Sequence, residues 1–155
     1  MTTTPNPPAT IDADAFSVSR TISISAPLEK VWAAITEPEH IAKWAGQQAT
    51  IDALEVGGKG AWTFEGYGSV PLVIEEWDPP RAVAYRWGAM DAPVVDPVVS
   101  TVFRFTLEPT DAGTQLTVVE SGFQNLADPP ASMKDNREGW TSELDELVAY
   151  LEGSS

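Results

Sequence analysis

The sequence predicts an α+β fold in which a curved antiparallel sheet of about seven strands wraps around a long C-terminal helix. Three observations lead to this prediction. The chain ends in a long amphipathic helix, its middle part consists of short alternating segments separated by glycine- and proline-rich turns, and two short helical segments follow the first strand. Consecutive strands joined by short turns form an antiparallel meander, and the helix needs an apolar surface on which to bury its stripe.

The predicted C-terminal helix covers residues 128–152. Asp128 suits the N-cap, two prolines suit the first turn, and Gly153 follows the end. Its apolar stripe, at alternating spacings of four and three, consists of Met133, Arg137, Trp140, Leu144, Leu147 and Leu151. Its acidic side, which we expect to face solvent, consists of Asp135, Glu138, Glu143, Asp145 and Glu146.

The preceding elements are predicted from alternation and from breaks. A half-buried strand over residues 16–25 precedes short helices over residues 28–36 and 38–43, which are separated at Glu37-Pro38. Further strands are predicted over residues 47–56, 61–65, 72–77, 81–87, 101–107 and 114–121.

Composition limits the classes of function. Residues 1–15 are rich in Thr, Pro, Ala and Asp and are predicted to form a disordered tail, followed by one domain over residues 16–153. No cysteine is present, which excludes disulfides and thiolate metal sites. The formal net charge of −14 argues against nucleic acid and anionic membrane surfaces as partners. With no membrane-spanning run and no signal-peptide pattern, we expect a cytoplasmic protein without membrane insertion.

A series of short motifs follows in order along the chain: Ile24-Ser25-Ala26-Pro27 with Val31-Trp32, Pro38-Glu39-His40-Ile41 with Trp44, Val56-Gly57-Gly58, Trp77-Asp78-Pro79-Pro80-Arg81, Tyr85-Arg86-Trp87, Gly113-Thr114-Gln115-Leu116-Thr117, Glu120-Ser121-Gly122-Phe123, and Gly139-Trp140. Their order and spacing over residues 20–151 resemble the START-like (helix-grip) superfamily. This superfamily is also called the polyketide cyclase/dehydrase and lipid-transport (SRPBCC) superfamily. Within it, the chain looks like the branch named for the activator of the heat-shock chaperone's ATPase.

The resemblance implies a hydrophobic cavity between the sheet and the terminal helix. The leading prediction is therefore binding of a small hydrophobic molecule (lipid-, polyketide- or aromatic-like) without a cofactor. Because the superfamily hosts many functions, two alternatives stay open. One is a co-chaperone-type protein-interaction module with a filled core. The other is a cyclase- or hydratase-type enzyme acting on a polyketide-like substrate.

An aromatic set is the main candidate for a ligand site. The predicted strands place six aromatic side chains on the concave face, and the helix adds Trp140 and Leu144 opposite them. The six are Trp62, Phe64, Tyr85, Trp87, Phe103 and Phe105. The same side chains could instead fill the interior completely, so an open cavity and a filled core are both retained.

Two charged residues occupy apolar positions. Glu120 shares its strand parity with Leu116 and Val118, which predicts an inward carboxyl group with a raised pKa, a weak candidate for a general acid. A frayed strand would instead bring it to water or to an arginine. Arg137 could close the cavity mouth and bind an acidic ligand group, or extend to solvent. In an enzyme, Tyr67, Tyr85 or Arg137 would orient the substrate.

The remaining candidates have simpler interpretations. His40 is the only histidine, so we expect no metal site and an exposed helix position. Arg86 and Arg104 are expected on the outer face of the sheet, paired with acidic residues. The valine-rich loop over residues 88–98 could be a lid or a homodimer contact. A chaperone is a further possible partner.

Overall fold

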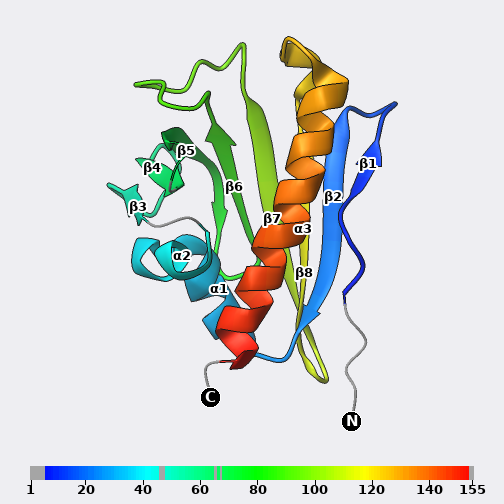
Figure 1. Cartoon of the computed structure of the whole chain (residues 1–155). Helices are drawn as coiled ribbons and strands as arrows, with labels where there is room; N and C mark the ends of the chain where they lie inside the picture. Colours follow the sequence, from blue (N-terminus) through cyan, green and yellow to red (C-terminus); the bar gives the residue numbers. More distant parts are fainter. Residues whose placement is uncertain (1–5, 46–47, 65, 67, 154–155) are drawn as a thin grey trace.

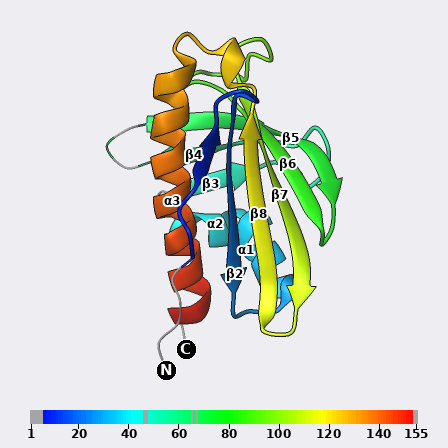
Figure 2. The same ribbon diagram turned by 90° about the vertical axis from the view of Figure 1, so that its right-hand side faces the viewer.

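The computed structural model describes residues 6–45, 48–64, 66 and 68–153. Over these residues the chain forms an eight-stranded antiparallel sheet in the order β1-β2-β8-β7-β6-β5-β4-β3. The long helix α3 lies across the concave face, and α1 and α2 lie beside its C-terminal half (Figures 1 and 2). The predicted helix-grip architecture is confirmed.

The elements have the following bounds. The strands are β1 (Thr10–Asp12), β2 (Ser17–Ile24), β3 (Gln48–Ile51), β4 (Lys59–Phe64), β5 (Gly68–Asp78), β6 (Ala82–Trp87), β7 (Thr101–Thr110) and β8 (Gly113–Ser121). The helices are α1 (Leu28–Thr36), α2 (Pro38–Trp44), the short 3₁₀ helix η1 (Phe123–Asn125) and α3 (Pro129–Gly153). Among the described residues, no helix combines the length and the apolar character that crossing a bilayer requires.

The N-terminal segment differs from the predicted disordered tail. Residues 10–12 form β1, which pairs with the edge of β2 through Ile11 and Val18, and Ala9 is fully buried. Its backbone pairs with a strand edge that would otherwise be open, so few apolar side chains are needed to hold it. The prediction is wrong for residues 6–15, and residues 1–5 lie outside the described residues.

The strand predicted over residues 47–56 is also shorter than expected. It ends at Ile51, and Gln47 lies outside the described residues. A tight turn follows, in which a Cβ on Gly58 would lie 1.9 Å from the carbonyl oxygen of Ala53. Only glycine fits this approach, which lets the connection over residues 52–58 lead back into β4.

The outer face of the sheet carries the expected ion pairs. Arg86 binds Glu75 with its Nε at 2.8 Å, and Arg104 binds Glu76 with its Nε at 2.6 Å. A register shift in β5 between Ile74 and Glu76 lets both consecutive glutamates reach this face. These partly exposed pairs confirm the predicted pairing and contribute little to stability.

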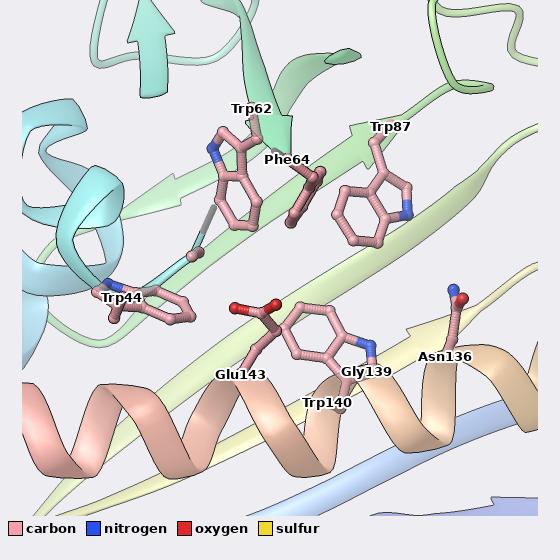
Figure 3. A pocket seen from close by; sticks show the side chains of 9 residues that line it. Trp44, Trp62, Phe64, Trp87, Asn136, Gly139, Trp140 and Glu143 are labelled. Carbon is pink, nitrogen blue, oxygen red and sulfur yellow. The ribbon is translucent and has the colours of Figure 1, made fainter. Parts of the chain in front are cut away.

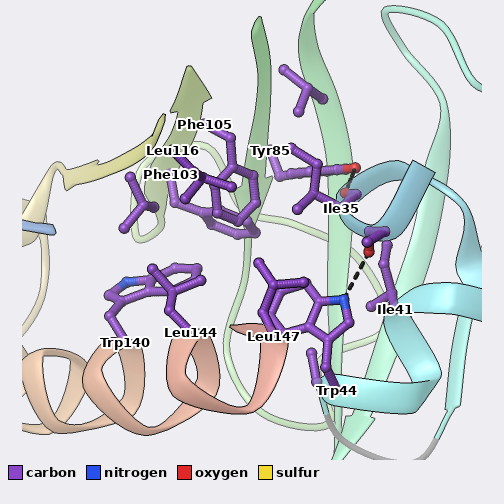
Figure 4. Close-up of a cluster of buried hydrophobic side chains, with 14 of the residues drawn as sticks. Ile35, Ile41, Trp44, Tyr85, Phe103, Phe105, Leu116, Trp140, Leu144 and Leu147 are labelled. Carbon is purple, nitrogen blue, oxygen red and sulfur yellow. Dashed lines mark hydrogen bonds between the residues drawn. The ribbon is translucent and has the colours of Figure 1, made fainter. Parts of the chain in front are cut away.

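Most of the interior is filled. Figure 4 shows α3 placing Trp140, Leu144 and Leu147 against the aromatic side chains of the sheet. The phenol of Tyr85 donates to the carbonyl of Ile35 at 2.8 Å, which satisfies the hydroxyl group inside the core. These side chains form one continuous hydrophobic core between α3 and the sheet.

Arg20 fixes α3 to the edge of the sheet. Its side chain is 1% exposed, on the same face of β2 as Val18 and Ile22. Its guanidinium donates to the carbonyls of Pro7 (2.7 Å) and Thr141 (2.8 Å) and to Asp145 (2.7 Å). A buried arginine therefore ties the N-terminal segment, β2 and α3 together.

Candidate functional site

A small cavity remains at one edge of the filled core, where α2, β4, β6 and α3 meet. We call it the recess, and its volume is about 110 Å³. Its lining, shown in Figure 3, consists of Trp44, Ala45, Trp62, Phe64, Trp87, Asn136, Gly139, Trp140 and Glu143. A cavity of about 150 Å³ holds benzene, so the recess has room for roughly four to five non-hydrogen atoms.

Local sequence rules position each wall. Trp62 and Phe64 are two residues apart on β4 and share a face, and Trp87 ends β6 in register with Thr101 of β7. The wall from α3 consists of Asn136, Gly139, Trp140 and Glu143. Residues three or four apart lie on the same side of a helix, so these side chains face the recess together. Trp44 is fixed because its indole Nε1–H donates to the carbonyl of Ala34 at 2.7 Å.

The recess shares five lining residues with an open groove of about 780 Å³. The shared residues are Phe64, Trp87, Asn136, Gly139 and Glu143. The far wall of the groove includes Met90 and Val99 of the loop between β6 and β7, which lies near the N-terminal end of α3 (Figure 1). Val94 and Val98 of this loop are 69% and 72% exposed. Both predicted roles of the loop, lid and dimer contact, remain hypotheses.

Glu143 is the acidic group of the recess. The half-buried side chain has no hydrogen-bond partner within the described residues, and its carboxylate turns into the space between Trp44 and Trp140 (Figure 3). Burial, and secondarily the charge of Glu146, raises the pKa of Glu143 to about 7. Its predicted place on the solvent side of α3 is therefore wrong.

A second unpaired group lies in the wall that β4 supplies. The indole Nε1–H of Trp62 is buried and has no acceptor among the residues that the structure describes. A buried donor without a partner is uncommon, and a molecule or a water in the recess could supply one.

Glu120 faces inward, as its strand parity predicts, and is fully buried. Its carboxylate accepts hydrogen bonds from four side chains: Thr101 (2.5 Å), Trp140 (2.8 Å), Asn136 (2.9 Å) and Trp87 (3.0 Å). Burial raises the pKa of Glu120, although each of these donors acts to lower it. The carboxyl group lines neither the recess nor the groove, but its four donors do, so it holds four of the lining side chains from behind.

The other predicted site residues divide into two groups. Trp62, Phe64, Trp87 and Trp140 line the recess. Tyr85, Phe103, Phe105 and Leu144 are fully buried in the core and do not line it.

Arg137 and Tyr67 do not join the recess either. Arg137 is exposed on another side of α3, about 100° around the helix from Asn136, and donates through Nε to the carbonyl of Ala9 at 3.0 Å. The structure therefore does not place it at the cavity mouth. Tyr67 lies outside the described residues.

Five lining residues were not predicted: Trp44, Ala45, Asn136, Gly139 and Glu143. The three on α3 share a helical spacing adjacent to the apolar stripe, and this signal was available in the sequence. The position of α2, which opens this side of α3 to a cavity, is a tertiary property that no local pattern predicts.

His40 and metal binding complete the set of candidates. The His40 side chain on α2 is 39% exposed, and its Nδ1 lies 2.7 Å from the hydroxyl oxygen of Tyr150. Within the described part of the chain, no cluster of three or more His, Asp or Glu side chains could hold a metal ion.

Several solved structures resemble this chain. MLL2253 from Mesorhizobium loti is 27% identical, with 90% of this chain and 98% of that chain covered and a TM-score of 0.76. The Aha1 dimer from Colwellia psychrerythraea is 21% identical, with 90% and 98% covered and a TM-score of 0.72. CalU16 from Micromonospora echinospora is 22% identical, with 88% and 76% covered and a TM-score of 0.67.

Comparison with curated protein sequences gave no match. A family model does match, over residues 25–152, which include α1, α2, the strands β3 to β8 and nearly all of α3. The match covers well over half of the chain and agrees with the helix-grip architecture, a ligand-binding fold. The chain belongs to the Activator of Hsp90 ATPase homolog 1-like protein family.

Proposed function

We propose that this protein binds a small, mainly apolar molecule, or the end group of a larger one, in the recess. The observation that carries the proposal is an aromatic-lined cavity at the edge of a core that is otherwise filled. Five aromatic side chains form most of its walls: Trp44, Trp62, Phe64, Trp87 and Trp140. Aromatic walls with a few polar groups are typical of small-molecule sites.

The volume of the recess limits the ligand. Pockets that enclose a drug-sized molecule usually have about 300–1,000 Å³. The recess has about 110 Å³, so a whole steroid or polyketide does not fit inside it. The open groove of about 780 Å³ continues from it and could hold the remainder of a longer molecule between α3 and the loop after β6.

The enzyme alternative has less support. Glu120 was its proposed acid, but its carboxylate is surrounded by four donors and has no contact with the recess or the groove. A general acid must come within hydrogen-bond reach of the reacting atom. We therefore assign Glu120 a positioning role.

Gly139 provides the test of the proposal. It lines the recess, and a Cβ added there would meet no atom within 4 Å, so Gly139→Leu extends a side chain into open space. Replacing glycine within a helix favours folding by roughly 0.5–1 kcal/mol, so lost binding would not reflect unfolding. Gly139→Leu should keep or raise the melting temperature.

The readout is native mass spectrometry after incubation with the neutral probe 3,3-dimethyl-1-butanol, whose branched end fits the recess. The wild-type protein should bind one molecule, and Gly139→Leu should lose this binding. Equal binding by the two proteins, or no binding by the wild type, would contradict the proposed site.

A further inference from the structure

We infer that the recess selects an alkylated ammonium cation, held by the aromatic walls and paired with Glu143. This inference rests on the proposed function, since it names the chemical class of the ligand for the same recess. Three properties of the recess support it: ring geometry, size and charge.

The aromatic rings enclose the recess from several directions. The ring of Trp62 is inclined at 74° to that of Trp44, with centroids 6.1 Å apart, and at 84° to that of Trp87, at 5.8 Å. Trp140 lies 5.9 Å from Trp87 and adds a wall from the helix. Aromatic faces carry negative potential, and a cation within about 6 Å of several of them is attracted by each.

The size of the recess suits a compact alkylated cation. A trimethylammonium group has four non-hydrogen atoms, and the volume of about 110 Å³ accepts roughly that number. A bare ammonium ion would be strongly hydrated and would gain little from apolar walls, whereas methyl groups bury favourably against them.

The charges around the recess favour a cation over an anion. Glu143 projects into the recess without a partner among the described residues (Figure 3), and leaving a carboxylate half-buried and unpaired is costly. The adjoining groove adds Asp135 and Glu138, and no Lys, Arg or His lines either space within the described residues. The carboxylates of Glu143, Asp135 and Glu138 would repel a fatty acid or a phosphate.

Choline and 3,3-dimethyl-1-butanol provide a matched test, because the two differ mainly in a charged nitrogen against a neutral carbon. Both are titrated into the protein by calorimetry at pH 8, where Glu143 is ionised. We expect choline to bind about tenfold more tightly than the neutral molecule. Glu143→Gln should reduce this preference to about twofold or less.

Glu39→Gln is the control variant. Glu39 is exposed on α2 and lines neither space, so its substitution changes the net charge equally but should keep the tenfold preference. Binding of the neutral molecule without a preference for choline would overturn the inference and leave the proposed function standing. Failure of both molecules to bind would overturn both. An unchanged preference in Glu143→Gln would also overturn the inference.

Discussion

At the residue scale, two carboxyl groups in one region have opposite surroundings. Glu120 is fully buried and accepts hydrogen bonds from four side chains, whereas Glu143 is half-buried and has no partner within the described residues. Burial raises the pKa of both. A buried carboxyl group surrounded by donors organises its neighbours, while an unpaired one at the edge of a cavity is available to a ligand.

Replacing Glu120 with Leu should strongly destabilise the fold. The substitution removes the acceptor for the indole of Trp140 and for the amide of Asn136, and each unsatisfied buried donor costs about 1–3 kcal/mol. We expect a loss of about 3 kcal/mol or more in the free energy of unfolding, measured by urea denaturation. A loss below about 1 kcal/mol would show that the hydrogen bonds from these four side chains to Glu120 are not formed in solution.

Glu143 should make stability depend on pH. Its pKa in the folded protein is about 7, above its ordinary value of 4.5, so the folded state binds a proton more tightly than the unfolded chain between these values. The contribution of Glu143 to stability therefore falls as pH rises from 4.5 to 7. Glu146 faces it from the same helix, and the α2, β4 and β6 residues lining the recess are uncharged.

Glu143→Gln should consequently be more stable than the wild type at pH 8, by about 1 kcal/mol after allowance for solvent screening. The two proteins should be nearly equal at pH 4, where the carboxyl group is protonated in both states. Urea denaturation at the two pH values measures the difference. If Glu143→Gln were less stable than the wild type at pH 8, the Glu143 carboxylate would have a stabilising partner in the folded protein, contrary to this account.

At the element scale, the position of α3 depends on the segment before β2. Arg20 joins this segment, β2 and α3, and Thr141 of α3 accepts a hydrogen bond from the backbone of Ala9 at 3.0 Å. Because α3 supplies one wall of the recess, contacts on its other side determine how wide the recess is.

Arg20→Met should lower the free energy of unfolding by about 2–4 kcal/mol, because it removes the hydrogen bonds that the buried guanidinium donates to Pro7, Thr141 and Asp145. Arg137→Met is a matched control on α3, since Arg137 is exposed and makes one hydrogen bond to the same segment. The control should cost about 1 kcal/mol or less. Thermal and urea denaturation measure both changes, and equal effects of the two substitutions would refute the special role of Arg20.

Elements that bury one face could be predicted from the sequence, whereas features that depend on distant partners could not. Hydrophobic periodicity predicted α3 and most strands, because an element that buries one face shows a regular apolar repeat within its own short stretch of sequence. Arg20 shares the parity of Val18 and Ile22, so its burial was visible in the pattern, but its acceptors lie far away in the chain. β1 was missed because its backbone pairing, rather than its side chains, holds it. The side of α3 that carries Glu143 looked like a solvent face because its packing partner, α2, could not be placed.

At the scale of the whole molecule, the net negative charge of the chain gives the recess a negative electrostatic potential. The formal net charge is −14, and the acidic groove leads to the recess. Such a field attracts cations over a distance that salt shortens, from about 30 Å at 0.01 M to about 10 Å at 0.1 M ionic strength.

Raising the sodium chloride concentration from 0.01 to 0.5 M should therefore weaken choline binding several-fold. Binding of the neutral 3,3-dimethyl-1-butanol should be unchanged or slightly tighter, because salt does not screen apolar contacts. Calorimetric titrations at the two concentrations give both dissociation constants. Equal salt dependence of the two molecules would contradict an electrostatic contribution.

The most direct test of the recess as a ligand site uses the indole N–H resonances of the six tryptophans. Four of them line the recess, namely Trp44, Trp62, Trp87 and Trp140, whereas Trp32 and Trp77 pack on each other elsewhere, with ring centroids 5.2 Å apart. In an NMR titration of ¹⁵N-labelled protein with 3,3-dimethyl-1-butanol, the first four resonances should shift in a saturable manner and the last two should not. No shift at the four, or equal shifts at all six, would contradict binding in the recess.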